Sequence, residues 1–270
     1  MNKKVYISSN ELDYSIDTKK KLIEKFNKRG ITVSENKNDV LDLIVCIGGD
    51  GTLLDTIHRF NFTSTPIVGI NTGTLGFFQE IDADDIDVFI DSFCDKTFKV
   101  QPLSIVECIV EDVEGNIKKF EALNEIILRG SNFRVCHLEI SIDGSFIENF
   151  SGDGVSVASS AGSTAYNYSL NGSIVDPRLN LLQVTPIAPM NTTAFRAFTS
   201  SLLLPHDLEL EIVPDMTRYK TFSVIADGID HKMKDIKIIK IKVGEKKVNL
   251  YRLESYDFWD KVKNKFLISD

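Results

Sequence analysis

The first third of the chain alternates short apolar runs with longer runs in which apolar residues recur at helical spacing. A sheet covered by helices typically gives this alternation. Gly30 follows the first helical run, where the end of a helix commonly needs a left-handed residue. The pattern predicts strands at 5–8, 41–47 and 66–70, and helices at 15–29, 52–60 and 84–93.

From about residue 102 the pattern changes to short strands separated by turn residues. Residues 114–116 and 143–144 are placed like hairpin turns. Further strands are predicted at 154–159, 208–212, 222–226, 236–241 and 248–251. We therefore expect an α/β N-terminal domain (1–100) and a β-rich, β-sandwich-like C-terminal domain (101–255), with a closing helix at 256–268 that docks back on the first domain.

Composition narrows the possible partners. The 270 residues carry a net charge of −8, which argues against a nucleic-acid surface, because phosphate-backbone binding needs clustered Lys and Arg. No segment approaches the roughly 18 apolar residues of a membrane span, and the start lacks a signal peptide's apolar stretch. The four cysteines are scattered along the chain, and we interpret them as reduced structural thiols. The four histidines lack the spacing of metal ligands. A cytoplasmic protein without a resident metal is expected.

The strongest chemical signal is a glycine-rich turn between a predicted strand and a predicted helix, Gly48-Gly49-Asp50-Gly51-Thr52. Exposed backbone N–H groups ahead of a helix suit a phosphate, and Thr52 is expected to cap the helix. A carboxylate beside phosphates is electrostatically unfavourable, so the presence of Asp50 in this turn requires an explanation. Asp50 could bind Mg²⁺ that bridges phosphate oxygens, accept a proton from an attacking hydroxyl, or simply hold a tight turn.

This turn resembles the phosphate-binding signature of NAD kinases, of diacylglycerol and sphingosine kinases and, more distantly, of phosphofructokinases. Three further stretches resemble the NAD kinases in order and approximate spacing: 71–77 (Asn-Thr-Gly-Thr-Leu-Gly-Phe), 123–125 (Leu-Asn-Glu) and 152–169, with its Gly-Ser-Thr-Ala-Tyr core. The family usually has Thr-Pro-Thr or Thr-Pro-Ser before that core, whereas this chain has Ser159-Ser160-Ala161. A Pro and one hydroxyl of the family pattern are therefore missing here.

The resemblance implies a role for each matching residue. Asp50 is the implied proton acceptor. The donor's phosphates are expected at Gly48, Gly49, Gly51 and Thr52. NAD is expected at Asp50, Gly51, Phe77, Asn124, Glu125, Arg134, Asp153, Thr164, Ala165, Tyr166, Asn167, Tyr168, Ser169 and Ala188. Phe77 would pack on adenosine, and Asn124 and Glu125 would bind sugar hydroxyls and amides.

The implied activity is transfer of the γ-phosphoryl group of ATP to the 2′-hydroxyl of the adenosine ribose of NAD, which forms NADP, with Mg²⁺ held by the donor phosphates. A homodimer or homotetramer with no membrane or nucleic-acid partner is expected. Two alternatives stay open, a lipid kinase that shares the glycine signature and a non-catalytic NAD-binding sensor. The choices between ATP and polyphosphate, and between NAD and NADH, also stay open.

Overall fold

The apolar run after residue 42 forms strand β3 (Leu43–Gly48), and all six of its residues are buried in the computed structural model. A strand buried on both faces must be covered on both sides of its sheet. The structure describes residues 3–73, 76–193, 196–218 and 221–267. Contacts divide the chain into a first unit, Met1–Pro102 with Lys246–Asp270, and a second unit, Leu103–Glu245.

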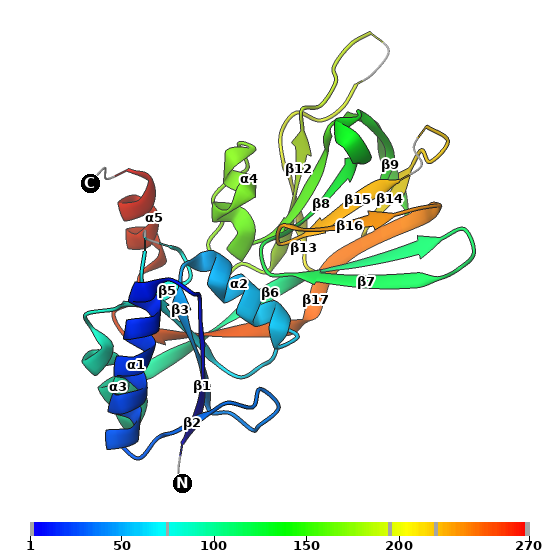
Figure 1. The fold of residues 1–270 in the computed structure, drawn as a ribbon. Coiled ribbons are helices and arrows are strands. Elements are labelled where there is room, and N and C mark those ends of the chain that lie inside the picture. Colours follow the sequence, from blue (N-terminus) through cyan, green and yellow to red (C-terminus); the bar gives the residue numbers. More distant parts are fainter. Residues whose placement is uncertain (1–2, 74–75, 194–195, 219–220, 268–270) are drawn as a thin grey trace. The chain divides into compact units, whose positions relative to one another are not determined.

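A parallel sheet forms the centre of the first unit (Figure 1). Its strands run in the order β2, β1, β3, β4, and both β5 and the C-terminal half of β17 pair with β4, also in parallel. The elements of this part of the chain are β1 (Lys4–Ser9), α1 (Asp13–Lys28), β2 (Thr32–Ser34), β3, α2 (Asp50–Arg59), β4 (Ile67–Asn71), β5 (Gln79–Asp82), α3 (Ile86–Asp95) and the closing α5 (Phe258–Phe266).

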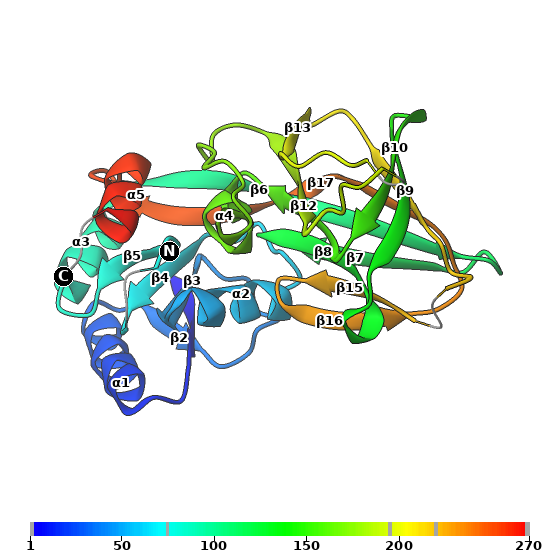
Figure 2. The ribbon, with the colours of Figure 1, turned by 90° about the horizontal axis from the view of Figure 1, so that it is seen from above.

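Helices cover both faces of this sheet. Leu22 and Phe26 of α1 and Phe89 of α3 share a core cluster with Val45 of β3. Successive residues of a strand face opposite sides, and the next residue, Cys46, instead contacts Thr56 of α2, with 3.6 Å between Sγ and Oγ1. Helices α1 and α3 therefore cover one face and α2 covers the other. Helices α1 and α3 lie side by side and are joined by two exposed ion pairs (Figure 2).

The second unit consists of antiparallel sheets around a single apolar cluster. One sheet has the order β13-β12-β11-β8-β15-β16, and the other contains β10-β9-β14-β17, with β6 paired to β17 and β7 paired to β6. Residues of both sheets fill the cluster, which is the arrangement of a β-sandwich. The elements are β6 (Phe98–Asp112), β7 (Ile117–Ala122), β8 (Glu125–Gly130), a 3₁₀ turn η1 (Ser131–Phe133), β9 (Cys136–Ile142), β10 (Ser145–Gly152), β11 (Gly154–Ser159), a 3₁₀ turn η2 (Ala161–Thr164), α4 (Tyr166–Ser169), β12 (Leu181–Ile187), β13 (Leu202–Pro205), β14 (Leu210–Pro214), β15 (Phe222–Ala226), β16 (Ile229–Met233) and β17 (Ile236–Leu253).

The pattern-based elements are present with small shifts of their ends, and two predictions need correction. Residues 236–241 and 248–251 were expected as separate strands but form one strand, β17, because strand structure continues through the more polar residues between them. Residues 246–255, expected in the second domain, belong to the first unit. Both hairpin turns are present, and Asp143 and Gly144 both have positive φ, as a tight two-residue hairpin loop requires.

All four cysteines are free thiols, and three of them are buried, as expected for structural cysteines. Burial raises the pKa of Cys46 to about 12, which keeps that thiol protonated. Among the described residues, no helix has the length and apolar character needed to cross a membrane.

Tyr251 of β17 provides a test of the first unit's core. Its buried ring stacks on Phe98 at 4.5 Å between centroids, and its hydroxyl donates to Ser92 Oγ at 2.8 Å. Because Ser92 still donates to the carbonyl of Thr97, we expect Tyr251→Phe to lower the free energy of unfolding by only about 1 kcal/mol. Denaturant unfolding measures this change, and Tyr14→Phe, at an exposed tyrosine, should change nothing.

Candidate active site

The glycine-rich turn follows β3 directly and leads into α2. Gly48 has φ +152°, and a Cβ at this position would lie 2.4 Å from Thr52 Oγ1, so the turn requires glycine there. Helix α2 begins at Asp50, with Gly49 as its N-cap and no side-chain cap. The expectation that Thr52 caps the helix was therefore wrong, because Thr52 lies inside the first turn with its hydroxyl beside Gly48.

The turn also lies at a special position in the parallel sheet. Strands β1 and β3 are neighbours, and the helices that follow them, α1 and α2, cover opposite faces. In open α/β sheets, ligands bind beyond the carboxyl ends of strands at such a switch point. Gly48 ends β3 at this point, and the N-terminus of α2 adds its unsatisfied N–H groups. This end of the first unit therefore has the geometry of an anion site.

Asp50 is held by the backbone of a distant loop. Its Oδ2 accepts from the N–H of Phe77 at 2.9 Å, and its Oδ1 accepts from the N–H of Phe78 at 3.1 Å. A Cβ on Gly76 would lie 2.3 Å from Asp50 Oδ1. The second glycine of the 71–77 motif, Gly76, thus allows the loop to approach the carboxylate. The middle of that motif, Thr74 and Leu75, lies outside the described residues.

The ring of Phe77 packs on α5. Its centroid is 5.4 Å from that of Phe266 and 6.5 Å from that of Phe258, and the side chain of Lys265 lies over its face. Phe77 is 7% exposed. The closing helix therefore docks on the loop that binds Asp50, and the structure places Phe77 in the core of the first unit.

A buried ion-pair network, which the sequence did not indicate, joins β5, the strand that follows this loop, to α5 and β17. Arg252 Nη1 lies 3.0 Å from Glu80 Oε2, and Lys261 Nζ lies 3.6 Å from the same oxygen. Lys261 also donates to the carbonyl of Gln79. Burial, reinforced by the positive charge of Arg252, lowers the pKa of Lys261 to about 8. No local pattern relates these residues, since about 170 residues separate Glu80 from Arg252.

In the second unit, a turn with the sequence Leu123-Asn124-Glu125 is held by one aspartate. Asp227 Oδ2 accepts from the N–H of Leu123 at 2.7 Å, and its Oδ1 accepts from the N–H of Asn124 at 2.8 Å. Asp227 has φ +45° and directly follows β15, beside the start of β8. In sequence, Asp227-Gly228 looks like a common turn dipeptide. The pattern therefore did not identify Asp227 as the residue that positions the turn.

Two polar groups of this turn are buried without hydrogen-bond partners among the described residues, namely Asn124 Oδ1 and Glu125 Oε2. Buried polar atoms are normally paired, so these two atoms lack partners that bound solvent or a ligand would normally supply. Burial, with the negative charge of Asp227, raises the pKa of Glu125 to about 8. Near neutral pH this carboxyl is therefore mostly protonated and can donate a hydrogen bond as well as accept one.

The segment from residue 159 to 169 packs against the same turn. Ser159 donates its hydroxyl to the carbonyl of Leu123, and a Cβ on Gly162 would lie 2.1 Å from the carbonyl oxygen of Asn124. The hydroxyls of the unusual Ser159-Ser160 pair therefore bind backbone carbonyls. Of the candidates here, Asn167 is buried and paired with Thr185 at 2.6 Å, Thr164 and Ala165 are half-buried, and Tyr166, Tyr168 and Ser169 are exposed.

The remaining candidates lie at the other end of the same strands. Gly154 pairs with Arg129 near the end of β8, and Ile187 pairs with Gly154. Asp153, Ala188 and Arg134 therefore gather beyond Gly130, whereas Asn124 and Glu125 stand at the opposite end of β8. A seven-residue separation along extended chain amounts to roughly 20 Å. The structure thus separates the predicted NAD-binding residues of the second unit into two groups.

Solved structures of nucleotide kinases share this fold. The chain superimposes on yeast NADH kinase in complex with NADH with a TM-score of 0.85 and 25% identity, covering 98% of this chain and 87% of that one. An NAD kinase from Archaeoglobus fulgidus in complex with ATP matches with a TM-score of 0.76 at 24% identity over 97% of each chain, which supports the fold alone. The protein therefore has the two-domain architecture of the kinases that act on nicotinamide dinucleotides.

Residues 4–98 match the ATP-NAD kinase N-terminal domain, and residues 123–253 match the ATP-NAD kinase C-terminal domain. The NAD kinase of Finegoldia magna is 31% identical over 97% of both chains, and that of Leuconostoc mesenteroides is 32% identical over 98% of both. The chain belongs to the NAD kinase family.

The raised pKa of Glu125 predicts a pH dependence of stability. Between about pH 4.5 and 8 the unfolded chain releases a proton that the folded protein keeps, so rising pH favours unfolding through this group. We expect the stability gained by Glu125→Gln over the wild type to grow from pH 5 to pH 8 and then level off, with about 5 kcal/mol as an upper bound. Urea unfolding at several pH values measures it.

Glu245→Gln, at an exposed glutamate, serves as the control and should show a flat difference across the same pH range. A flat difference for Glu125→Gln would contradict the raised pKa.

Proposed function

We propose that Asp50 accepts the proton of the 2′-hydroxyl of the adenosine ribose of NAD while the γ-phosphoryl group of ATP is transferred to that oxygen, which yields NADP. The backbone of residues 48–52 would hold the donor phosphates. The observation that carries the proposal is the fixed carboxylate of Asp50 at the glycine turn that ends β3.

Two features of Asp50 support a role in proton transfer. Its oxygens each accept one backbone N–H, which fixes the plane of the carboxylate. An ionised carboxylate has about four lone-pair sites, so the two remaining sites can accept from a substrate hydroxyl. Phosphoryl transfer passes through a loose transition state, in which in-line positioning and charge neutralisation contribute more than a strong base.

The turn of Asn124 and Glu125 supports binding of NAD. An amide with an unpartnered buried oxygen and a carboxyl that is mostly protonated near neutral pH together offer donors and acceptors for sugar hydroxyls. Thr164, Ala165 and the exposed ring of Tyr166 adjoin this turn through η2 and α4 and offer a small surface and an aromatic face for a base. Leaving such polar atoms unpaired is costly, so a ligand that pairs them gains affinity.

Mg²⁺ is proposed to enter with the donor. Within the described ranges, no group of three or more His, Cys, Asp or Glu could hold a metal ion, so its oxygen ligands would come mainly from the phosphates. Bound there, the ion would neutralise phosphate charge, while residues 48–52 supply N–H donors from the protein.

The expected homodimer or homotetramer is part of the proposal. Asp153 and Ala188 stand at the opposite end of β8 and β11 from Asn124, so they fit a role toward NAD bound by another copy of the chain. A cytoplasmic location, expected from the sequence, also stays a proposal. Membership of the NAD kinase family argues against the lipid kinase alternative.

The role of Asp50 is tested by Asp50→Asn. The carboxamide can still accept from one of the two amides of residues 77 and 78 but cannot accept a substrate proton, so we expect kcat for NADP formation to fall by about 100-fold or more. The KM for NAD should stay within a few fold. Steady-state kinetics with NAD, ATP and Mg²⁺ measure both values, and thermal unfolding checks that the variant folds.

Asp55→Asn, at an exposed aspartate of the same helix, is the matched control and should retain wild-type kcat. Turnover of Asp50→Asn near the wild-type level would remove Asp50 from the reaction. A wild-type protein that binds NAD without making NADP would instead indicate the sensor alternative.

Asn124→Ala tests the NAD-binding turn. Loss of the amide should weaken NAD binding by about 1–3 kcal/mol, because the ligand groups it pairs are left without a partner. Isothermal titration calorimetry with NAD measures the affinity. Asn38→Ala, at an exposed loop asparagine, should bind NAD like the wild type, and equal affinity in both variants would exclude Asn124 from the site.

A further inference from the structure

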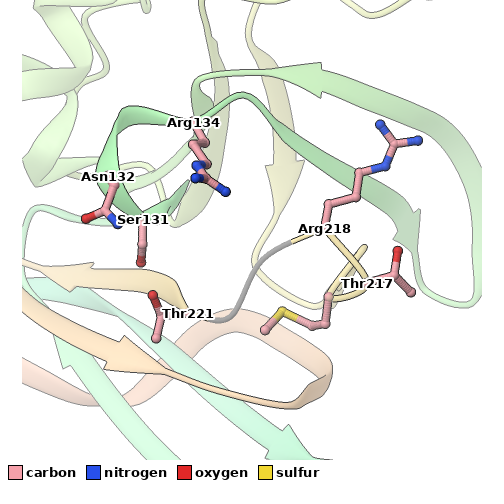
Figure 3. Close-up of a pocket in the computed structure, with 7 residues that line it drawn as sticks. Ser131, Asn132, Arg134, Thr217, Arg218 and Thr221 are labelled. Carbon is pink, nitrogen blue, oxygen red and sulfur yellow. The ribbon is translucent and has the colours of Figure 1, made fainter.

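A polar cavity of about 550 Å³ lies in the second unit, beyond the C-terminal end of β8 (Figure 3). This volume is within the range of pockets that bind small molecules, roughly 300–1,000 Å³. The cavity is lined by Ser131, Asn132, Arg134, Met216, Thr217, Arg218 and Thr221. These residues come from η1 and its flank and from the segment between β14 and β15.

The cavity is separate from the turn of Asn124 and Glu125. Strands β8 and β15 are antiparallel, with Phe222 opposite Gly130 and Ala226 opposite Ile126. Thr221 and Ser131 therefore flank one end of this pair, whereas Asp227 and Asn124 flank the other. The proposed NAD-binding turn and the cavity are about one strand length apart, roughly 20 Å.

The lining favours an anion. It contains two arginines and several hydroxyl and amide groups but no acidic residue. Arg218 is already engaged, with Nε 3.0 Å from Asp215 Oδ2 and Nη1 3.2 Å from His137 Nε2. Arg134 has no ion-pair or hydrogen-bond partner for its side chain among the described residues, and its guanidinium extends over the space beside Ser131 (Figure 3).

A buried polar atom points to the same conclusion. Ser131 is only 6% exposed and lines the cavity, yet its hydroxyl has no hydrogen-bond partner among the residues described. Such a group normally finds a partner in protein or bound solvent or ligand. The neighbouring Asn132 has φ +60°, a strained conformation that is often found at binding sites.

We propose that this cavity is a second phosphate-binding site, in which the guanidinium of Arg134 and the hydroxyl of Ser131 bind the phosphate of a small molecule. Arginine presents a planar set of N–H donors that matches phosphate oxygens, and a serine hydroxyl donates to a third oxygen. The free volume beyond a single phosphate leaves room for the rest of a nucleotide or sugar phosphate. This inference does not depend on the proposed catalytic role of Asp50.

The test uses isothermal titration calorimetry of the full chain with inorganic pyrophosphate and, separately, with ADP. Pyrophosphate can also bind the glycine turn of the first unit, so the informative quantity is the change caused by each substitution. We expect Arg134→Gln to abolish one binding event or raise its Kd at least tenfold, and Ser131→Ala to raise the same Kd severalfold. Arg178→Gln, at an arginine whose side chain is 80% exposed and lies outside the cavity, should bind like the wild type.

Hydrogen exchange identifies the part of the chain to which pyrophosphate binds. Amides of residues 130–136 should exchange more slowly with pyrophosphate in the wild type but not in Arg134→Gln. Equal Kd for pyrophosphate and ADP would mean that the site recognises the phosphates alone, and tenfold tighter ADP would identify a nucleotide phosphate. Unchanged binding and exchange in a folded Arg134→Gln would overturn the proposal.

Discussion

Two backbone N–H groups, those of Phe77 and Phe78, bind the carboxylate of Asp50, and the candidate site of the first unit depends on this contact. The end of β3 and the start of α2 position the carboxylate, and the loop before β5 positions the two N–H groups. The loop in turn is fixed by the packing of Phe77 on α5 and by the pairing of Lys261 with Glu80. Residues at the far end of the chain therefore determine where the carboxylate lies.

The second unit also contains a carboxylate bound to backbone N–H groups, but there the candidate binding residues lie on the backbone side of the contact. There the carboxylate of Asp227 is the positioning group, and the backbone that it binds carries Asn124 and Glu125. Holding a turn from its backbone leaves the side chains free for a ligand. This arrangement also brings the buried carboxyl group of Glu125 close to the carboxylate of Asp227. The negative charge of Asp227 adds to the effect of burial in raising the pKa of Glu125.

Glycines enable both arrangements because they allow close approach of main chain. A side chain at Gly76 would overlap the carboxylate of Asp50, and one at Gly162 would overlap the carbonyl of Asn124. Preorganised polar groups of this kind cost stability in the free protein but need little rearrangement when a ligand binds. The apolar clusters of the two units supply the stability that offsets this cost.

The sequence by itself determined the class of each unit, the position of most strands and helices, and the glycine turn with its single carboxylate. These features are local, since periodicity and turn residues act over a few neighbouring positions. The family resemblance, too, was carried by short motifs. Boundaries were placed less accurately, as the continuous strand β17 demonstrates, because polar residues inside a strand look like loop residues in sequence.

Only the tertiary structure decided which distant groups meet. It paired Asp50 with the amides of residues 77 and 78, assigned Asp227 to the turn of Asn124, and moved Phe77 into contact with α5. It also separated Arg134 from Asn124 by the length of β8. The physical reason is that these contacts join residues tens to hundreds of positions apart, and their geometry follows from strand register and packing, which no local pattern of residues specifies.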